Sequence, residues 1–510
     1  MSDQGDAAFL IDQLIAQGVT LFCIAPGARS ASLTSFLARD SRTETIVHYD
    51  ERGLAFYALG YGKGAKTPAV IVTTSGSAVG NLLPAVMEAY HSCTPLILIT
   101  ADRPPESRSC GANQTTDHLP LLSSFVRWQA DLPPTLSSSY FRSIAAQAFS
   151  HATQNPPGPV HLNVQIRDPS LPLTSCPRGD PVSLLSSEIV APSTHTAQKK
   201  GLIVIGEIPS SPLPILDLAK RLRWPVCADL LSNARVYPTE EQLRHPDEII
   251  AAEPHLKPDF LLHFGTRRIL KESLPWPIDL HVSPYPFLID PSRTVKGRAC
   301  SNIASFCQDF SAPAADPAWL AAWKKADAKC APPLASRLVE EKKAMDLLAQ
   351  IAPPDTLFFF GNSLAIRLAD LSFFPKSPFG FAANRGLSGI DGNIATAAGL
   401  AKGAKKRLIA WIGDQTALHD LNSLPLLHTV KGPITLVICN NFKGAIYSAL
   451  PLPFAHWRET KTHIEAPHCW TFEQAATMFH LPYSSFDAIS FSNSSLVEFI
   501  PENLNTERNF

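Results

Sequence analysis

Leu408-Ile409-Ala410-Trp411-Ile412 runs directly into Gly413-Asp414-Gln415, and Ile434-Thr435-Leu436-Val437-Ile438-Cys439 runs directly into Asn440-Asn441. Apolar runs of this length predict buried strands, and the helix-length segment 416–430 between them predicts a βαβ unit with parallel strands. Asp414 and Asn441 would then emerge at the same carboxyl edge of the sheet, where open α/β sheets bind ligands. Two oxygen-bearing side chains suit Mg²⁺, which takes few protein oxygens beside phosphate and water, and Gly413 would let a phosphate approach the backbone closely.

Each of these features also has a simpler interpretation. Asp414 can cap the following helix, and Asn440-Asn441 can form a turn. Together they resemble the thiamine-diphosphate signature, Gly-Asp-Gly followed by Asn-Asn, although Gln415 stands at the second glycine.

Such enzymes also need a glutamate from another domain. Glu51 opens a predicted helix, a position where the helix dipole alone would favour a carboxylate. The turn 73–78 is rich in small residues and could hold an anion, but many strand-to-helix turns share this property.

Strands alternate with helices along most of the chain, which predicts an α/β fold built on parallel sheets. The pattern divides into a first domain over 1–170, a Ser/Pro/Thr-rich linker over 171–200, a middle Rossmann-like domain over 201–340 and a third domain over 341–510. The expected helices include 53–63, 78–91 and 394–402. The expected strands are 21–25, 69–73, 96–100, 160–164, 202–205, 260–264, 287–289, 357–360, 408–412 and 434–439.

Composition excludes several classes of protein. The 510 residues carry 44 Lys and Arg against 45 Asp and Glu, a net charge of −1 that argues against a general nucleic-acid binder. A hydrophobic content of 45% rules out dominant disorder, and neither a long apolar run nor a basic leader indicates membrane insertion or secretion. The ten cysteines include no C-x-x-C pair, and no G-x-G-x-x-G or Walker loop follows a strand. We therefore expect a cytoplasmic protein without a zinc site, a disulfide framework or a nicotinamide fold.

Several further strings follow one another along the first and third domains: Pro26-Gly27-Ala28-Arg29-Ser30, Asp50-Glu51-Arg52-Gly53, Thr100-Ala101-Asp102-Arg103-Pro104-Pro105-Glu106, Cys110-Gly111-Ala112-Asn113-Gln114, Gly361-Asn362-Ser363-Leu364, Asn384-Arg385-Gly386 and Ser388-Gly389-Ile390-Asp391-Gly392. In content and order they resemble the MenD family, the 2-succinyl-5-enolpyruvyl-6-hydroxy-3-cyclohexene-1-carboxylate synthases of menaquinone biosynthesis. The middle domain matches weakly. The resemblance implies three doubly wound parallel-sheet domains of the thiamine-diphosphate enzyme type, the first binding the cofactor's pyrimidine and the third its diphosphate and Mg²⁺.

The resemblance also implies a transferase reaction, in which 2-oxoglutarate is decarboxylated and the resulting succinyl carbanion equivalent adds to isochorismate in a 1,4 sense. Its cofactors would be thiamine diphosphate and Mg²⁺, with Mn²⁺ as a substitute. Glu51 would be the catalytic partner of the aminopyrimidine ring, and Ile390 would lie under the bent cofactor. The metal would be held by Asp414, Asn441 and the backbone carbonyl of Lys443. The remaining cofactor-binding positions would be Ser363, Gly413, Gln415, Ile446 and Leu450.

Both implied substrates are dicarboxylates, so the site needs cations, and the arginine fork suits carboxylates. By resemblance, the substrate-binding residues would be Arg29, Arg103, Asn113, Gln114, Lys271, Arg367 and Arg385. In this family Glu51 would come from one subunit and the metal ligands from another. The resemblance therefore implies a homodimer or tetramer with active sites at the subunit interface.

This chain departs from the family pattern at a few positions. Ala28 replaces a usual serine, Glu272 stands where an arginine often follows Lys271, and Lys443 and Ala445 interrupt a glycine-rich turn. The tail is also shorter than the family leads us to expect. Two alternatives stay open: another thiamine-diphosphate 2-oxoacid decarboxylase or carboligase, of which acetolactate synthase is one type, or an inactive homologue. The arginines argue against the first, and the retained Glu51, Asp414 and Asn441 argue against the second.

Overall fold

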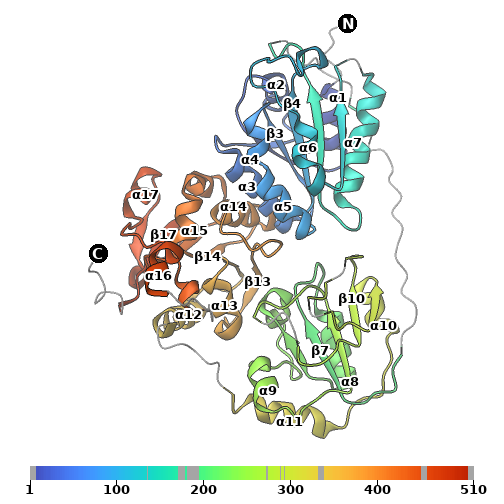
Figure 1. Cartoon of the computed structure of the whole chain (residues 1–510), viewed down its shortest axis with the longest axis vertical. Coiled ribbons are helices and arrows are strands. Elements are labelled where there is room, and N and C mark those ends of the chain that lie inside the picture. Colours follow the sequence, from blue (N-terminus) through green and yellow to red (C-terminus); the bar gives the residue numbers. More distant parts are fainter. Residues whose placement is uncertain are drawn as a thin grey trace. The chain divides into compact units, whose positions relative to one another are not determined.

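The computed structural model describes residues 7–134, 136–170, 178–180, 195–270, 274–287, 289–291, 293–330, 338–449 and 457–502. Its strands form three sheets in which neighbouring strands run parallel, with helices packed against them (Figure 1). The predicted α/β class is therefore confirmed. By density of contacts the chain divides into two compact units, Met1–Ser186 with Asn384–Ile500, and Ser187–Ala383 with Pro501–Phe510. No helix in the described part of the chain combines the length and the apolar character needed to cross a membrane.

The first sheet has the strand order β2-β1-β3-β4-β6-β5. Helices α1, α2 and α7 share one hydrophobic core with β1, β3, β4 and β6, while α3, α4, α5 and α6 pack on one another and on the sheet. The elements are α1 Ala7–Ala16, β1 Leu21–Ile24, α2 Ala31–Leu37, β2 Glu44–Val47, α3 Glu51–Ala65, β3 Ala69–Thr73, α4 Ser77–Asn81, α5 Leu83–His91, β4 Leu96–Asp102, η1 Pro105–Ser107, α6 His118–Leu122, η2 Ser123–Phe125, β5 Trp128–Leu132, α7 Ser138–Thr153 and β6 Pro159–Gln165.

One expected helix of this region, 78–91, is wrong as a single element. The chain forms α4 and α5 with a break at Leu82. Pro84 lies in the first turn of α5, and because proline has no backbone N–H it cannot extend the preceding helix.

The second sheet has the order β11-β10-β9-β7-β8. The expected strand at 287–289 is wrong: the strand lies at Leu280–Ser283, where all four residues are buried. Pro284 and Pro286 follow it directly, and proline cannot donate to a strand ladder, so pairing ends there. The elements are β7 Gly201–Ile205, α8 Leu213–Leu222, β8 Val226–Ala228, η3 Leu230–Ser232, η4 Ala234–Val236, α9 Pro246–Ala252, β9 Phe260–Phe264, β10 Leu280–Ser283, β11 Gly297–Cys300, α10 Ile303–Asp309 and α11 Pro317–Asp327.

The third sheet has the order β13-β12-β14-β15-β17-β16. Its β14 and β15 pair in parallel with Gly413 opposite Cys439, as the two apolar runs predict. The segment 416–430 is not one helix but α15 followed by a 3₁₀ segment that contains Pro425. The elements are α12 Val339–Ile351, β12 Thr356–Phe360, α13 Leu364–Ser372, β13 Pro378–Ala382, α14 Asn393–Ala404, β14 Leu408–Gly413, α15 Asp414–His419, η6 Leu421–Thr429, β15 Ile434–Cys439, η7 Ala445–Ala449, α16 Trp457–Glu465, α17 Glu473–Met478, β16 Tyr483–Ser485, η8 Phe486–Ala488 and β17 Ser495–Phe499.

Helices α3 and α14 pack unusually closely because glycines line the contact. A Cβ built on Gly60 would lie 2.1 Å from the backbone oxygen of Thr396, and one built on Gly399 would lie 1.9 Å from that of Tyr57. Any side chain at these positions would force the helices apart. The contact joins the first-sheet region to the segment that begins at Asn384 within one compact unit.

A buried carboxylate caps the start of α14. Asp420 accepts hydrogen bonds from the backbone N–H of Ile394 at 2.7 Å, from that of Ala395 at 3.0 Å and from Ser423 Oγ at 2.6 Å. Burial nevertheless raises the pKa of Asp420 to about 6. The folded state binds the proton of the Asp420 carboxyl group more tightly than the unfolded chain does. Protonation of Asp420 therefore stabilises the fold fully below about pH 4, and this stabilisation is lost as pH rises through about 6.

We expect Asp420→Asn to remove this pH dependence, because the amide stays neutral and its oxygen can still accept the two N–H groups. Relative to the wild type, the variant should gain up to about 2 kcal/mol in free energy of unfolding between pH 4.5 and pH 8, since each pKa unit is worth about 1.4 kcal/mol and part of the shift lies below pH 4.5. Urea denaturation of both proteins across this range measures the effect. A difference between the two proteins that does not change with pH would contradict the prediction.

Candidate active site

The side chains of Asp414 and Asn441 converge at the carboxyl edge of the third sheet. The backbone N–H of Lys443 donates to Asp414 Oδ2 at 3.2 Å and to Asn441 Oδ1 at 3.3 Å, so one donor holds both oxygens close together. Asp414 is buried, and its other oxygen accepts from the N–H of Gln415 at 2.7 Å. The structure thus brings together two of the predicted metal ligands.

The loop after Asn441 carries a third candidate oxygen, the backbone carbonyl of Lys443. Phe442 takes a left-handed backbone conformation with φ of 61°, and the Lys443 carbonyl accepts from the N–H of Ala445 at 2.9 Å. A carbonyl oxygen has two lone pairs, so this bond leaves one free for a cation. A carboxylate, an amide oxygen and a backbone carbonyl are ligands that fit Mg²⁺. Among the described residues, no three His, Cys, Asp or Glu side chains form an alternative metal cluster.

Gln415, the residue at the signature's second glycine, has a structural role. Its Nε2 donates to the backbone oxygens of Glu465 at 2.8 Å and Ala466 at 3.0 Å. The N–H of Gly444 donates to the same Glu465 oxygen at 2.7 Å. Gln415 therefore fastens the segment after α16 to the loop that follows Asn441, a contact that a glycine could not make.

The segment after α16 also brings His468 to the site, a residue that sequence reasoning missed. Its Nδ1 accepts from the N–H of Trp470 at 3.3 Å, so the proton of the neutral ring lies on Nε2. This Nε2 is 3.3 Å from Asp414 Oδ2. The ring also stacks on Trp470, with centroids 5.3 Å apart. His468 lies far from the signature in sequence, and no pattern in the chain marks it.

The space beside Gly413 can accept a ligand. A Cβ built on Gly413 would meet no atom within 4 Å, although the residue is half-buried. Of the two predicted apolar cofactor positions, Ile446 in η7 is half-buried, and Ile390, before α14, is 36% exposed despite its apolar side chain. The donor set and the open space at Gly413 fit a cofactor that carries a diphosphate and binds together with Mg²⁺.

Glu51 is the first residue of α3, as predicted. Asp50 caps the helix by accepting from the N–H groups of Arg52 at 3.0 Å and Gly53 at 3.3 Å, so Glu51 itself is not needed as the cap. Its Oε2 accepts from Asn81 Nδ2 at 3.1 Å, at the end of α4. The carboxylate is half-exposed and therefore accessible to a ligand.

In the described part of the chain, two of the predicted substrate arginines contact backbone carbonyls rather than carboxylates. Arg29 Nη1 donates to the backbone oxygens of Ile166 at 2.7 Å and Arg167 at 3.1 Å, and Arg103 Nη2 donates to that of Asn113 at 2.8 Å. Within the described part of the chain, the Nε of each arginine is buried and makes no hydrogen bond. Two half-buried cations attract an anion to this edge of the first sheet.

Asn113 and Gln114 lie on an exposed segment that is joined to the turn after β3. Gln114 Nε2 donates to the Ser75 carbonyl at 2.9 Å, and Ser75 Oγ donates to the Gln114 carbonyl at 2.9 Å. Because Arg103 reaches the Asn113 carbonyl, the three predicted residues Arg103, Asn113 and Gln114 form one connected group.

The segment that carries Arg385 is held by a buried carboxylate on α5. Glu88 accepts from the N–H groups of Gly386 at 2.9 Å and Leu387 at 2.7 Å, and Lys63 Nζ is 3.5 Å away. A Cβ on Gly386 would lie 2.8 Å from the Glu88 carbonyl oxygen, so only glycine fits there. In the sequence Glu88 is one polar residue of an amphipathic helix, and sequence reasoning missed it.

We expect Glu88→Gln to lower the free energy of unfolding by about 1–3 kcal/mol, because a neutral amide replaces a buried charged acceptor of two N–H groups. Urea denaturation measures the loss. The exposed Glu473→Gln in α17 is the matched control and should change stability by less than about 0.5 kcal/mol. Equal stability of the two variants would show that Glu88 does not hold the segment.

The other predicted residues lie in the second compact unit or outside the described residues. Ser363 precedes α13 with φ of 68°, and Arg367 Nη1 donates to its carbonyl at 2.8 Å. Lys271, Glu272 and Leu450 lie outside the described residues.

Comparisons with known proteins agree with this geometry. A family model described as "Thiamine pyrophosphate enzyme, N-terminal TPP binding domain" matches residues 6–121. The chain is 35% identical to a protein of Rubrobacter xylanophilus named 2-succinyl-5-enolpyruvyl-6-hydroxy-3-cyclohexene-1-carboxylate synthase, over 93% of this chain and 89% of that protein. Proteins of the same name from Salinibacter ruber and Aeromonas salmonicida are 33% and 34% identical, over 96% and 94% of this chain and 90% and 89% of theirs.

Proposed function

Because the chain belongs to the 2-succinyl-5-enolpyruvyl-6-hydroxy-3-cyclohexene-1-carboxylate synthase family of thiamine-diphosphate enzymes, we propose that it catalyses the reaction for which its relatives are named. It couples loss of CO₂ from 2-oxoglutarate to 1,4-addition of the remaining four-carbon unit to isochorismate. The observation that carries this proposal is the convergence of Asp414 and Asn441 on the N–H of Lys443.

Thiamine diphosphate, when bound, supplies the electron sink for the loss of CO₂. Asp414, Asn441 and the Lys443 carbonyl would hold Mg²⁺, and the open space at Gly413 would admit the diphosphate. Ser363, Ile390, Gln415 and Ile446 are the further cofactor positions that we propose. The carboxyl group of Glu51 would hold the proton that it shares with the cofactor's aminopyrimidine ring, and Asn81 would keep that carboxyl group in place.

The charges on two arginines support the choice of dicarboxylate substrates. Arg29 and Arg103 bind only backbone carbonyls in the described part of the chain, so an incoming carboxylate need not displace a protein carboxylate. We propose that they bind substrate together with Asn113, Gln114, Lys271, Arg367 and Arg385. A small monocarboxylic acid has only one carboxylate to pair with a cation, so a decarboxylase of such acids would not need two arginines of this kind. This favours the synthase over the other thiamine-diphosphate enzymes.

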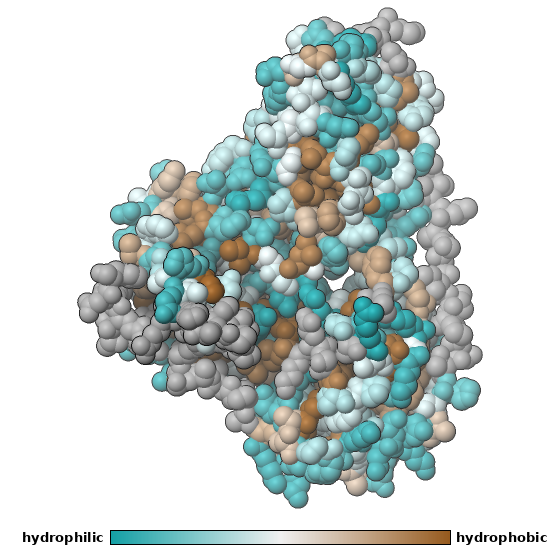
Figure 2. Space-filling model, viewed as in Figure 1, coloured by the Kyte–Doolittle hydropathy of each residue, from teal (hydrophilic) through white to brown (hydrophobic). Residues whose placement is uncertain are grey.

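We further propose a homodimer or a tetramer in which Glu51 and Asp414 of one active site come from different subunits. Within one chain, Arg52 Nη2 donates to the His419 carbonyl at 2.9 Å, so the start of α3 lies at the end of α15 opposite to Asp414. Val47 and Tyr49, which come shortly before Glu51 in the chain, are exposed apolar side chains, and so is Leu387. Apolar patches also interrupt the hydrophilic surface on the face shown in Figure 2, and a second subunit would cover surfaces of this kind.

The proposed domain division follows the sequence pattern: a pyrimidine-binding domain over 1–170, a linker over 171–200, a middle domain over 201–340 and a domain binding diphosphate and Mg²⁺ over 341–510. The carboxyl edges described above lie in the first and the last of these. The middle domain contributes Lys271 to the proposal.

The test is consumption of 2-oxoglutarate by the purified protein with thiamine diphosphate and Mg²⁺, with and without isochorismate. We expect consumption that depends on both cofactors and is coupled to isochorismate. Preferential consumption of pyruvate would favour a decarboxylase or acetolactate synthase instead. Cofactor binding without turnover of either acid would indicate an inactive homologue.

A further inference from the structure

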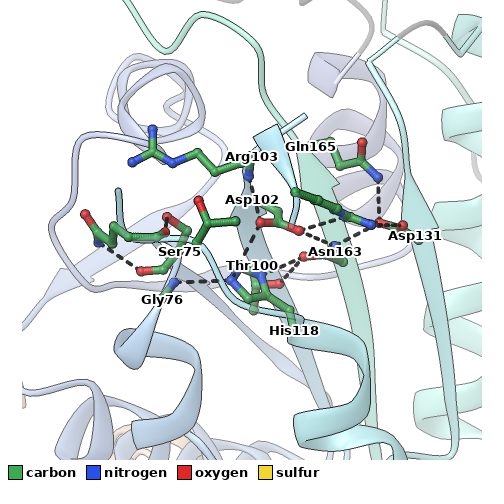
Figure 3. A network of polar contacts seen from close by, with 12 residues as sticks. Ser75, Gly76, Thr100, Asp102, Arg103, His118, Asp131, Asn163 and Gln165 are labelled. Carbon is green, nitrogen blue, oxygen red and sulfur yellow. Dashed lines mark hydrogen bonds and ion pairs between the residues drawn. The ribbon is translucent and has the colours of Figure 1, made fainter. Parts of the chain in front are cut away.

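A buried polar network adjoins Arg103 and the turn at Ser75 and Gly76 (Figure 3). It joins the carboxyl ends of β4 and β6 to the first residue of α6. Its central members Asp102, His118 and Asn163 are each about 1% exposed. Groups this deeply buried are costly unless they are paired, so the network fixes the positions of the loops that it joins.

The orientation of Asn163 follows from its two acidic neighbours. Its Nδ2 donates to Asp102 Oδ2 at 2.9 Å and to Asp131 Oδ1 at 2.8 Å, which leaves Oδ1 as an acceptor on the other side. Thr100 Oγ1 donates to this Oδ1 at 3.0 Å, and His118 Nδ1 lies 2.9 Å from it. His118 must therefore carry its proton on Nδ1 and donate it to Asn163.

This tautomer leaves the other ring nitrogen of His118 as an acceptor. The backbone N–H of Gly76 donates to His118 Nε2 at 3.2 Å. Gly76 has φ of 83°, and a Cβ there would lie 2.8 Å from Gln114 Cγ, so the turn fits closely against Gln114. Ser75 bonds Gln114 through both its carbonyl and its hydroxyl group. His118 thus holds the turn, and the turn holds Gln114.

A second cation keeps the network's carboxylates away from Arg103. Arg108 donates to Asp102 Oδ2 at 2.7 Å and to the two oxygens of Asp131 at 2.9 and 3.1 Å. Asp102 Oδ1 accepts the backbone N–H of Arg103 at 2.7 Å rather than its guanidinium group. The charge on the Arg103 side chain therefore stays available for a substrate carboxylate.

We propose that His118 is a positioning residue for substrate binding, which acts by accepting the N–H of Gly76 and thereby fixing the turn that orients Gln114. The inference rests on the proposed function, in which Gln114 binds substrate. His118 does not touch the reacting atoms. Its contribution depends on Nε2 acting as a hydrogen-bond acceptor. The side-chain carbonyl of Asn163 fixes this state, because it accepts the proton on Nδ1.

Two substitutions of His118 distinguish the contact made by its Nε2 from the contact made by its Nδ1. In His118→Gln the side-chain amide reaches the position of Nε2 and can still accept from Gly76, whereas in His118→Asn it reaches only the position of Nδ1. We expect His118→Asn to raise KM for at least one substrate about tenfold, the loss of roughly one hydrogen bond. Its kcat should change less than about threefold, and His118→Gln should keep KM within about threefold of the wild type. Thiamine diphosphate affinity should stay unchanged in both.

Hydrogen exchange at the Gly76 amide tests the same contact without turnover. We expect this amide to exchange faster in His118→Asn than in the wild type and to remain protected in His118→Gln. Equal protection of Gly76 in the wild type and both variants would overturn the inference, as would a loss of thermal stability in both variants without a change in KM. If the wild-type protein consumed no 2-oxoglutarate, the proposed function would fail, while the exchange measurement would still decide the role of His118.

Discussion

Asp414→Ala is expected to abolish Mg²⁺-dependent binding of thiamine diphosphate and to lower turnover by at least about 10³-fold, because it removes the only charged ligand in the proposed metal site. The carboxylate is buried and also accepts from the N–H groups of Gln415 and Lys443. The substitution therefore removes both the charge and the group that holds the loop after Asn441. Titration of the cofactor into the protein, with Mg²⁺ and with EDTA, measures the effect through intrinsic tryptophan fluorescence.

Two controls separate charge from loop geometry. Asp414→Asn keeps an acceptor for the Lys443 N–H but lacks the charge, so it should lose metal affinity while retaining the wild-type denaturation midpoint more nearly than Asp414→Ala. Asp487→Ala removes an exposed carboxylate from η8 and should leave cofactor binding unchanged. If Asp414→Ala bound the cofactor with wild-type affinity in Mg²⁺, the metal site would have to lie elsewhere.

Most interior strands could be predicted from sequence, although β10 was misplaced and β17 was not among the expected strands, whereas the edge strands could not. The strands Ala69–Thr73, Phe260–Phe264 and Ile434–Cys439 match their predicted ranges because continuous burial demands continuous apolar runs. The edge strands β2, β5, β8, β11, β13 and β16 were not predicted. An edge strand pairs on one side only, and all of these strands except the three-residue β8 are partly exposed; in β5 four of five residues are half-exposed. Its sequence therefore lacks the apolar run on which the prediction depends.

The candidate site divides in the same way. Asp414, Asn441 and Glu51 were found from sequence because each directly follows or opens an element whose direction the pattern predicts. His118, Glu88 and His468 act through contacts with residues distant in the chain; Glu88 and Gly386 are 298 positions apart. Nothing near them in the sequence distinguishes them from ordinary helix or loop residues. Only the folded chain shows which backbone groups they hold.

Glu51→Gln should lower kcat by about 10²–10⁴-fold while thiamine diphosphate still binds, because an amide cannot exchange a proton with the aminopyrimidine ring. The amide oxygen can still accept from Asn81, and Asp50 caps α3 independently, so we expect the fold to be unchanged. Single-turnover assays and cofactor titration of the variant separate the loss of chemistry from a loss of binding. Turnover near the wild-type value would remove Glu51 from the mechanism.

Mixing two inactive variants tests whether Glu51 and Asp414 of one site come from different subunits. If they do, a mixed dimer of Glu51→Gln and Asp414→Ala contains one site with both substitutions and one site with neither. After denaturation and joint refolding, about half of the dimers should be mixed, so about a quarter of wild-type activity should return. If both residues served the site of their own chain, every site would carry one substitution and the mixture would stay inactive. The return of activity therefore follows from shared sites alone, because neither variant can supply it separately.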